Sequence, residues 1–136
     1  MTAVLLTAFL LASRSVCLEG HPSVRTEFQK SFLVVIGTAL AEQPTVDADG
    51  FIALTTYRVK VDEVLRGMLA DTLSVVSQND SGRFPMDVGV QYLLFIFHGE
   101  KGLTVDNCGN SNAVRQAREA VRLARQLSHN APSGPR

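Results

Sequence analysis

The sequence has no excess of either charge. Its 13 basic and 13 acidic residues cancel, so no whole-molecule field draws the protein to nucleic acid or to an anionic membrane. Charged residues make up 19% of the chain and hydrophobic residues 46%, which is typical of globular rather than disordered chains. With 136 residues, the chain has room for one domain with its own core.

Catalytic motifs are also missing. Outside the tail the histidines are His21 and His98, which stand in different segments, and no serine lies in a G-x-S-x-G elbow. The acidic residues form no recognisable acid/base or metal-binding pair. We therefore expect a protein that is not an enzyme and that uses no cofactor and no bound metal.

The apolar run at the N-terminus is too short to cross a bilayer. It spans Ala3 to Ala12 and is followed by small residues at Ser13 and Ser15, so residues 1–15 are predicted to be a secretory signal peptide. No Lys or Arg precedes the run, and a buried N-terminal strand or helix is the alternative. Cleavage after Ser13 or after Ser15 fits the pattern. A lipoprotein start at Cys17 ranks third, because the residues just before it are not all small.

Cysteine is scarce, with only Cys17 and Cys108 in the chain. After export to an extracellular or periplasmic space we expect the two to pair. Such a bridge closes a loop of about 90 residues, and the chain-entropy treatment gives roughly 4 kcal/mol of stabilisation. Two unrelated thiols are the alternative. A zinc site is disfavoured, because Cys17 and His21 alone provide too few ligands.

Alternating residues predict a mainly β chain. The longest strand runs from Phe51 to Gly67, and a strand of this length must curl or change partners, as strands of small closed barrels do. Its predicted packed face consists of Phe51, Ala53, Thr55, Tyr57, Val59 and Val61. The other four strands of a meandering array are expected over Phe32–Ala41, Leu73–Ser77, Val90–Phe97 and Leu103–Cys108.

Three details refine this prediction of the strands. Gly37 lies inside the first apolar strand and predicts a bulge or a close approach of another backbone. Glu42 to Gly50 is expected to be a polar loop, because it contains Pro and Asp-Gly turn signals. The strand over Val90–Phe97 is apolar almost throughout and is therefore predicted to be central.

Two helices are expected to flank the strands. A short one over Ser23–Ser31 would be capped by Ser23, with Val24 and Phe28 facing inward. A final helix is predicted over 113–127, or 112–127 with the last of the capping residues Asn110–Asn112. Residues 128–136 are predicted to be a frayed tail.

The final helix carries a row of arginines, namely Arg115, Arg118, Arg122 and Arg125. Glu119 can reach Arg115 and Arg122 at helical spacing. Most such rows are a solvated face, and contact with an acidic partner is the alternative.

Five short strands with a helix favour an OB-type barrel, and many such barrels bind single-stranded nucleic acid. That function needs a basic groove interleaved with aromatic side chains. Here only Tyr57, Arg58 and Lys60 fit the requirement, and secretion argues against it. We therefore expect no nucleic-acid partner.

Several motifs follow one another in a recognisable order. They are Cys17-x3-His21-Pro22, Phe28, Val34-Val35-Ile36, Tyr57-Arg58-Val59-Lys60-Val61, Leu65-Arg66-Gly67, Tyr92-Leu93-Leu94, a turn at Gly102, and Leu103 to Cys108. In order and spacing, from about Ser15 to Asn112, they resemble the N-terminal domain of tissue inhibitors of metalloproteinases. The resemblance implies a secreted, five-stranded, closed barrel of the netrin-like OB type over residues 16–127.

The resemblance also implies a mechanism and a departure from it. In this family, signal cleavage leaves a cysteine whose free amine and carbonyl chelate the zinc of a protease, and two disulfides hold that terminus rigid. By spacing, Cys17 corresponds to the second cysteine of the family and Cys108 to its partner. Ser15 and Ser81 stand where the first cysteine and its partner would be. Chelation by Ser15 would require signal cleavage after Arg14.

A partner-binding ridge follows from the same resemblance. Its predicted members are Ser15, Val16, Cys17, Leu18, Met68, Leu69, Ala70, Asp71, Ser81, Gly82, Arg83 and Phe84. We expect a secreted, monomeric, non-catalytic module that binds a protein, with a zinc metalloprotease as its most specific partner. The alternative is an envelope-tethered structural or interaction module without inhibitory activity, which would contact a membrane only through an uncleaved or lipidated N-terminus.

Overall fold

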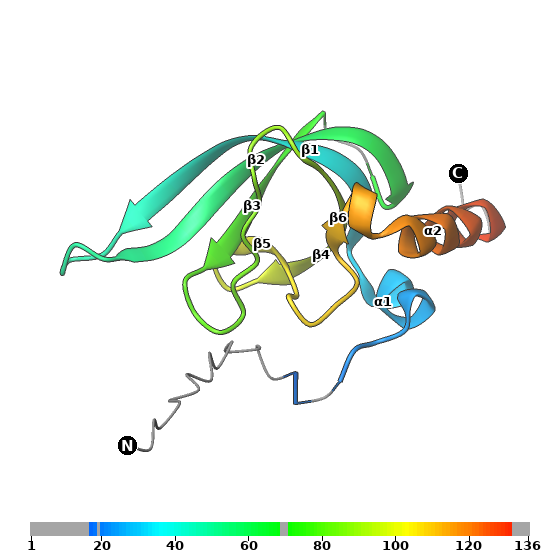
Figure 1. Ribbon diagram of the computed structural model, residues 1–136, viewed down its shortest axis with the longest axis horizontal. Helices are drawn as coiled ribbons and strands as arrows, with labels where there is room; N and C mark the ends of the chain where they lie inside the picture. Colours follow the sequence, from blue (N-terminus) through cyan, green and yellow to red (C-terminus); the bar gives the residue numbers. More distant parts are fainter. Residues whose placement is uncertain (1–16, 19, 69–70, 132–136) are drawn as a thin grey trace, which may run out of the picture.

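A computed structural model describes residues 17–18, 20–68 and 71–131 of the chain (Figure 1). The predicted signal peptide lies outside the described residues. So do Ser15, Val16, Leu69 and Ala70 of the predicted ridge.

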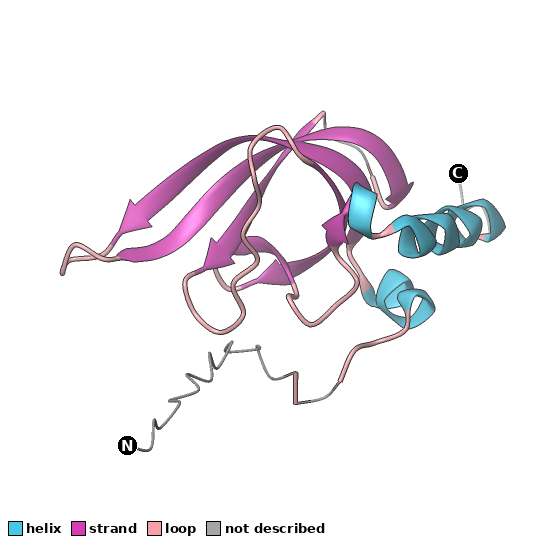
Figure 2. Cartoon of the chain, viewed as in Figure 1, coloured by secondary structure: helices cyan, strands magenta, loops and turns pink. Residues whose placement is uncertain are grey.

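The described residues form a mainly β fold with one antiparallel sheet and two flanking α-helices (Figure 2). The strands are β1 (Leu33–Val46), β2 (Ile52–Arg66), β3 (Thr72–Gln78), β4 (Gln91–Gly99), β5 (Gly102–Val105) and the two-residue β6 (Asn112–Ala113). Five of them correspond to the five predicted strands, and β6 was not predicted.

The strand order differs from a simple meander. It is β3-β2-β1-β4-β5, with β6 paired to β4. After β3 the chain crosses back, so β4 pairs with β1 rather than with β3. In a meander the apolar β1 would be an edge strand, whereas in this order both β1 and β4 have a neighbouring strand on each side. The predicted central position of β4 is confirmed.

The two edges of the sheet, β3 and β5, lie side by side because the sheet is strongly curved (Figure 1). Thr104 Oγ1 on β5 donates a hydrogen bond to the carbonyl oxygen of Val76 on β3 at 3.0 Å. Between the described residues of these strands no backbone ladder is formed. The sheet is therefore not closed by hydrogen bonds, and the predicted closed barrel is not confirmed.

The β1–β2 hairpin is longer than the sequence pattern predicts. Glu42 to Val46 was expected to belong to a loop, but these residues continue β1 and pair with β2, leaving a short turn over 47–51. Pro44 is tolerated because this half of β1 has β2 on one side only, and proline is accepted on edge strands. Backbone pairing with β2 has overridden the local turn signals.

The predicted packed face of β2 is only half correct. Tyr57 and Val59 are buried, as expected from the period-two pattern. Phe51 and Ala53 at the start of the segment are exposed, because this end of the hairpin extends past the core (Figure 1). The pattern therefore identified the strand but not where its burial begins.

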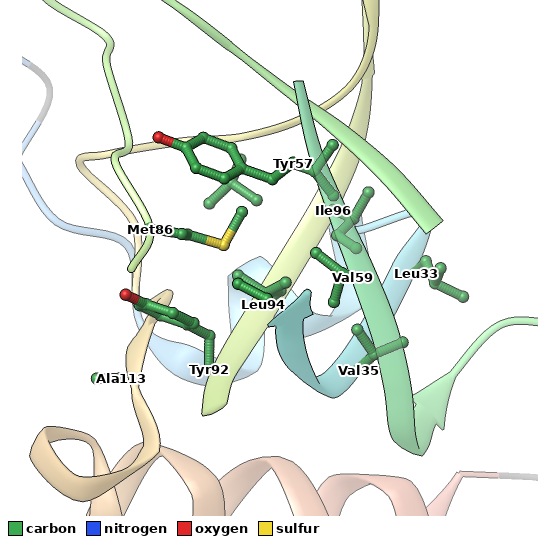
Figure 3. Close-up of a cluster of buried hydrophobic side chains, with 12 residues drawn as sticks. Leu33, Val35, Tyr57, Val59, Met86, Tyr92, Leu94, Ile96 and Ala113 are labelled. Atoms are coloured by element: carbon green, nitrogen blue, oxygen red, sulfur yellow. The ribbon is translucent and has the colours of Figure 1, made fainter. Parts of the chain in front are cut away.

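Two hydrophobic clusters lie on the two faces of the curved sheet. The concave cluster contains Val35, Tyr57, Val59, Leu94 and Ile96, with Met86 from the β3–β4 loop (Figure 3). The second cluster lies beneath the helices and is built from Phe28, Val34, Ile36, Leu65, Leu93, Phe95, Val121 and Ala124. Alternate residues of β4 enter alternate clusters, which explains why this strand is apolar throughout.

The N-terminal helix agrees with its prediction. α1 spans Val24–Lys30, and the Ser23 side chain accepts a hydrogen bond from the backbone N–H of Thr26. Phe28 is buried and Val24 packs partly buried against the same cluster. A serine cap and apolar residues four apart were sufficient to place this helix.

The start of the final helix was predicted wrongly. The residues Asn112–Ala113 form β6, Val114–Gln116 form the 3₁₀ turn η1, and α2 spans Arg118–Asn130. Ala117 precedes α2 without any side-chain cap. The expected capping side chains are used elsewhere, since Ser111 Oγ accepts a hydrogen bond from the N–H of Phe95 at 2.8 Å. α2 also continues through residues 128–130, which were assigned to the tail.

Gly37 gives a first testable consequence of this packing. A Cβ added there would lie 2.5 Å from Cγ1 of Val59 and 2.9 Å from the carbonyl oxygen of Lys60. The register of β1 and β2 also shifts between Ile36 and Gly37, so both the predicted bulge and the predicted close approach are present. We expect Gly37→Ala to lower the free energy of unfolding by about 1–3 kcal/mol, as overpacking does.

Urea denaturation measures this loss, and Gly82→Ala is the matched control. Gly82 lies in an exposed turn, where an added Cβ would have Asp80 Oδ1 as its nearest neighbour at 3.2 Å. The control should change the free energy of unfolding by less than about 0.5 kcal/mol. Equal losses in the two variants would contradict the proposed crowding at Gly37.

Candidate functional site

The described part of the N-terminal segment, residues 17–18 and 20–22, is attached to the turn that follows β5. Cys17 and Cys108 form a disulfide with their Cα atoms 5.7 Å apart, across a sequence separation of 91 residues. The predicted pairing is confirmed. The bridge is consistent with an oxidising compartment.

Hydrogen bonds fix the same segment at three further points. His21 Nδ1 lies 2.7 Å from the carbonyl oxygen of Cys108, and the Asn110 side-chain amide donates to the carbonyl oxygen of Pro22 at 2.9 Å. Within the segment, the N–H of Gly20 donates to the carbonyl oxygen of Cys17 at 3.0 Å. One covalent bond and two long-range hydrogen bonds therefore hold a segment that has no regular secondary structure.

Glu27 on α1 also contacts the turn that follows β5, through Asn110. Its Oε2 accepts hydrogen bonds from the backbone N–H of Asn110 at 2.6 Å and from the Asn110 side-chain amide at 2.8 Å. Its Oε1 is buried and has no hydrogen-bond partner in the described structure. Any Cβ at Gly109 would collide with this carboxylate, so a glycine is required for the turn to pack over Glu27.

Burial raises the pKa of the Glu27 carboxyl above its ordinary value of 4.5. Its hydrogen bonds from Asn110 favour the charged form and oppose the rise, whereas the negative charge of Asp106 adds to it. The loss of solvation is the larger effect. Glu27 is therefore a titratable group at the centre of the contact between α1 and the turn after β5.

A hollow of about 570 Å³ lies beside the disulfide. Its lining includes the disulfide itself, the side chains of Glu27, Lys30 and Asp106, and the ring of Phe97. Leu18 stands at its edge with 92% of its surface exposed. The site thus combines a fixed backbone, a protruding apolar side chain and an adjoining hollow with charges of both signs.

Two parts of the predicted ridge lie at this site, namely Cys17–Leu18 and residues 81–83. The Asn107 side-chain amide donates to the carbonyl oxygen of Ser81 at 2.7 Å, and Asn107 directly precedes Cys108. Residues 81–83 are exposed, and the bond to Asn107 joins them to the turn that carries Cys108. Phe84 is different, because its half-buried ring packs on the concave cluster and makes an edge contact with Tyr92, with 6.2 Å between ring centroids.

Met68 and Asp71 lie elsewhere. They precede β3, whereas Ser81 follows it, so the two loops stand at opposite ends of a seven-residue strand, roughly 20 Å apart at the usual rise per residue. Met68 is 93% exposed and adjoins a different hollow, which is lined by Phe28 and Phe32. The eight ridge residues that the structure describes therefore do not form one surface.

The arginines of the predicted row differ in their ion-pair partners. Arg122 pairs with Glu119 at 2.6 Å, as helical spacing predicted, and Arg125 pairs with Glu63 on β2 at 2.9 Å. Arg115 lies in η1 rather than in α2, and within the described residues it pairs with no carboxylate. The row is therefore partly neutralised by the protein itself.

The sequence pattern did not predict the roles of Glu27 and Asn110. A signal was present for Glu27, because it stands three residues after Val24 and beside Phe28, on the face of α1 predicted to be buried. A carboxylate at such a position needs a nearby donor. Asn110 was interpreted only as a helix cap, because its partner lies 83 residues away.

Comparison of the sequence with protein-family models and with characterised proteins yields no match. Among the residues that the structure describes, no three His, Cys, Asp or Glu side chains converge as metal ligands. No helix in the same part of the chain is long and apolar enough to cross a membrane.

Proposed function

We propose that the protein is a secreted, non-catalytic module that binds another protein through its N-terminal segment. The observation that carries this proposal is the geometry of Leu18, which protrudes almost fully from a segment fixed by the Cys17–Cys108 bridge. Folding gains nothing from an apolar side chain in water. Binding a partner would bury the Leu18 side chain, and the entropic cost would be low because the backbone is already ordered.

The scaffold that we propose is a closed, OB-type barrel of the netrin-like kind. Its support is the curvature of the sheet and the approach of its edges, where Thr104 already bonds to Val76. Side-chain contacts between β3 and β5 would complete a barrel that lacks only a backbone ladder. Such a barrel holds the N-terminal segment and residues 81–83 at one rim.

The most specific form of the proposal is inhibition of a zinc metalloprotease, similar to the family that the motifs resemble. In that form Leu18 enters the substrate cleft next to the zinc. The departure at Ser15 means that a terminal amine could reach the zinc only after cleavage behind Arg14. The fixed segment supports docking whether or not such chelation occurs.

Inhibition of a panel of zinc proteases by micromolar mature protein tests this form. We expect Leu18→Glu to weaken inhibition at least tenfold, because it places a charge where an apolar anchor docks. Val88→Glu is the matched control, since Val88 is an exposed valine of the β3–β4 loop. A panel left wholly uninhibited would remove the inhibitor form, and equal effects of the two variants would remove the role of Leu18.

Mass spectrometry of the exported N-terminus separates the remaining alternatives. A terminus at Ser15 supports chelation. A lipid on Cys17 would support the tethered module, and it would also exclude the bridge to Cys108, because one Sγ cannot form both bonds. Any other terminus leaves protein binding without chelation.

A further inference from the structure

The end of the β1–β2 hairpin, residues 40–56, is an arm that projects from the rest of the molecule (Figure 1). Three apolar side chains at its tip are exposed, namely Phe51 at 72%, Val46 at 55% and Ile52 at 46%. None of them belongs to either hydrophobic cluster. The core therefore does not account for apolar residues at this tip.

The tip is an ordered turn. Asp47 Oδ1 accepts hydrogen bonds from the backbone N–H groups of Asp49 at 2.9 Å and of Phe51 at 3.0 Å. The N–H of Asp47 donates to the carbonyl oxygen of Phe51 at 2.8 Å, and Gly50 takes the positive φ of 86° that the turn requires. Phe51 is thus presented on a preorganised backbone, which lowers the entropic cost of docking.

The arm is uniformly acidic. It carries Glu42, Asp47 and Asp49, and the chain has no Lys or Arg between Lys30 and Arg58. An anionic membrane would repel such an arm. The surface that fits it is apolar at its centre and basic at its edge.

A surface of that kind lies between α1 and α2. These two helices stand at the opposite end of the molecule from the arm (Figure 1). We name it the α1–α2 groove. It encloses about 200 Å³ over an apolar floor of Val24, Leu123 and Leu127, with Arg25 at its edge. Within the described residues Arg25 pairs with no carboxylate, whereas Arg122 and Arg125 of α2 are already paired with Glu119 and Glu63. The hollow is smaller than typical small-molecule pockets, so it suits one aromatic side chain.

We propose that the arm of one copy docks in the α1–α2 groove of a second copy, head to tail. Phe51 enters the hollow, while Asp47 and Asp49 face Arg25. The two surfaces are different, so the contact is heterologous and a third copy can add in the same way. One anchor and a small area give weak, concentration-dependent association. This proposal departs from the monomer expected from the sequence and is independent of the proposed protease partner.

Sedimentation velocity of the mature protein, from micromolar to millimolar concentration, tests the association. We expect the weight-average sedimentation coefficient to rise with concentration and to fall when salt screens the charges. Phe51→Ser and Arg25→Glu should each weaken association at least tenfold. Met68→Ser should leave the association unchanged, because Met68 is an apolar residue outside both surfaces and is even more exposed than Phe51, at 93% against 72%.

Mixing the two variants gives the decisive measurement. Phe51→Ser keeps its groove and Arg25→Glu keeps its arm, so an equimolar mixture should form a dimer that grows no further, although each variant alone is monomeric. Both changes are at exposed positions, and circular dichroism confirms folding. A wild type that stays monomeric at millimolar concentration overturns the proposal. So does a failure of the mixture to associate, or an Arg25→Glu variant that associates like the wild type.

Discussion

Replacing both Cys17 and Cys108 by serine should lower the free energy of unfolding by about 4 kcal/mol. The bridge spans 91 residues, and a loop of that length removes much of the conformational freedom of the unfolded chain. Domains of this size are stable by only about 5–15 kcal/mol, so the loss would be a large fraction of the total. Urea denaturation with a common m-value measures it.

The same variant also tests whether the bridge alone orders the N-terminal segment. The hydrogen bonds from His21 and Asn110 remain available after the change. We therefore expect the segment to become more protease-sensitive while the sheet stays folded. A reductant should bring the wild type to the stability of the double variant and should not affect the double variant. A loss below about 1 kcal/mol would show that the bridge constrains the unfolded chain far less than its length implies.

Changes at Glu27 should have the second-largest effect, with opposite results for two substitutions. Glu27→Ala removes the acceptor of both Asn110 hydrogen bonds and leaves two partly buried donors without a partner. We expect a loss of about 2 kcal/mol near neutral pH, because orphaned donors cost more than the removal of one buried charge gains. Glu27→Gln keeps an acceptor for Asn110 and should be at least as stable as the wild type at that pH.

The pH dependence of these variants follows from the raised pKa of Glu27. A carboxyl that is harder to ionise in the folded than in the unfolded protein stabilises the fold fully below its unfolded pKa of 4.5. That contribution is lost as the pH rises through the folded pKa. The wild type should therefore lose stability relative to Glu27→Gln as the pH rises above 4.5, and the difference should level off once Glu27 is ionised in both states.

Asp62 titrates with the opposite sign. Hydrogen bonds from Thr38 and Gln91 lower its pKa below the ordinary value of 3.8, so its contribution is lost as the pH falls. The wild type and Glu27→Gln both contain Asp62. The contribution of Asp62 therefore cancels in the difference between their free energies of unfolding. Glu42→Gln, at an exposed position, is the control for the removal of one negative charge. A stability difference between wild type and Glu27→Gln that does not change with pH would contradict the raised pKa of Glu27.

Local patterns predicted much of the secondary structure because each depends on neighbours in the chain. Ser23 and the four-residue spacing of Val24 and Phe28 identified α1, and the alternation around Tyr57 and Val59 identified the buried part of β2. Gly37 marked a real irregularity between β1 and β2. In each case the deciding interaction lies within one helix or between adjacent strands.

The predictions failed where a distant partner overrode a local signal. Pro44 and Asp49 indicated a loop from Glu42, yet pairing with β2 extended β1 to Val46. Ser111 looked like a helix cap, but it bonds to Phe95 on β4, and α2 starts only seven residues later, at Arg118. A side chain with two available uses takes the one that satisfies a buried backbone group.

The candidate site shows the same division. Cysteine scarcity led to the Cys17–Cys108 bridge, because two thiols in an exported chain have only one intramolecular pairing. The bond of Glu27 to Asn110, and the separation of Met68 from Ser81 by β3, had no counterpart in the pattern. They depend on which strand ends meet, and therefore on the strand order.

By itself, the sequence determined the five main strands, the N-terminal helix and the disulfide. Periodicity and capping act locally, and two cysteines allow only one intramolecular pair. Only the tertiary structure decided the crossing of β4 to β1, the projecting arm and the groove between α1 and α2. These features arise from contacts between residues far apart in the chain. Their energies depend on positions in space that no single segment specifies.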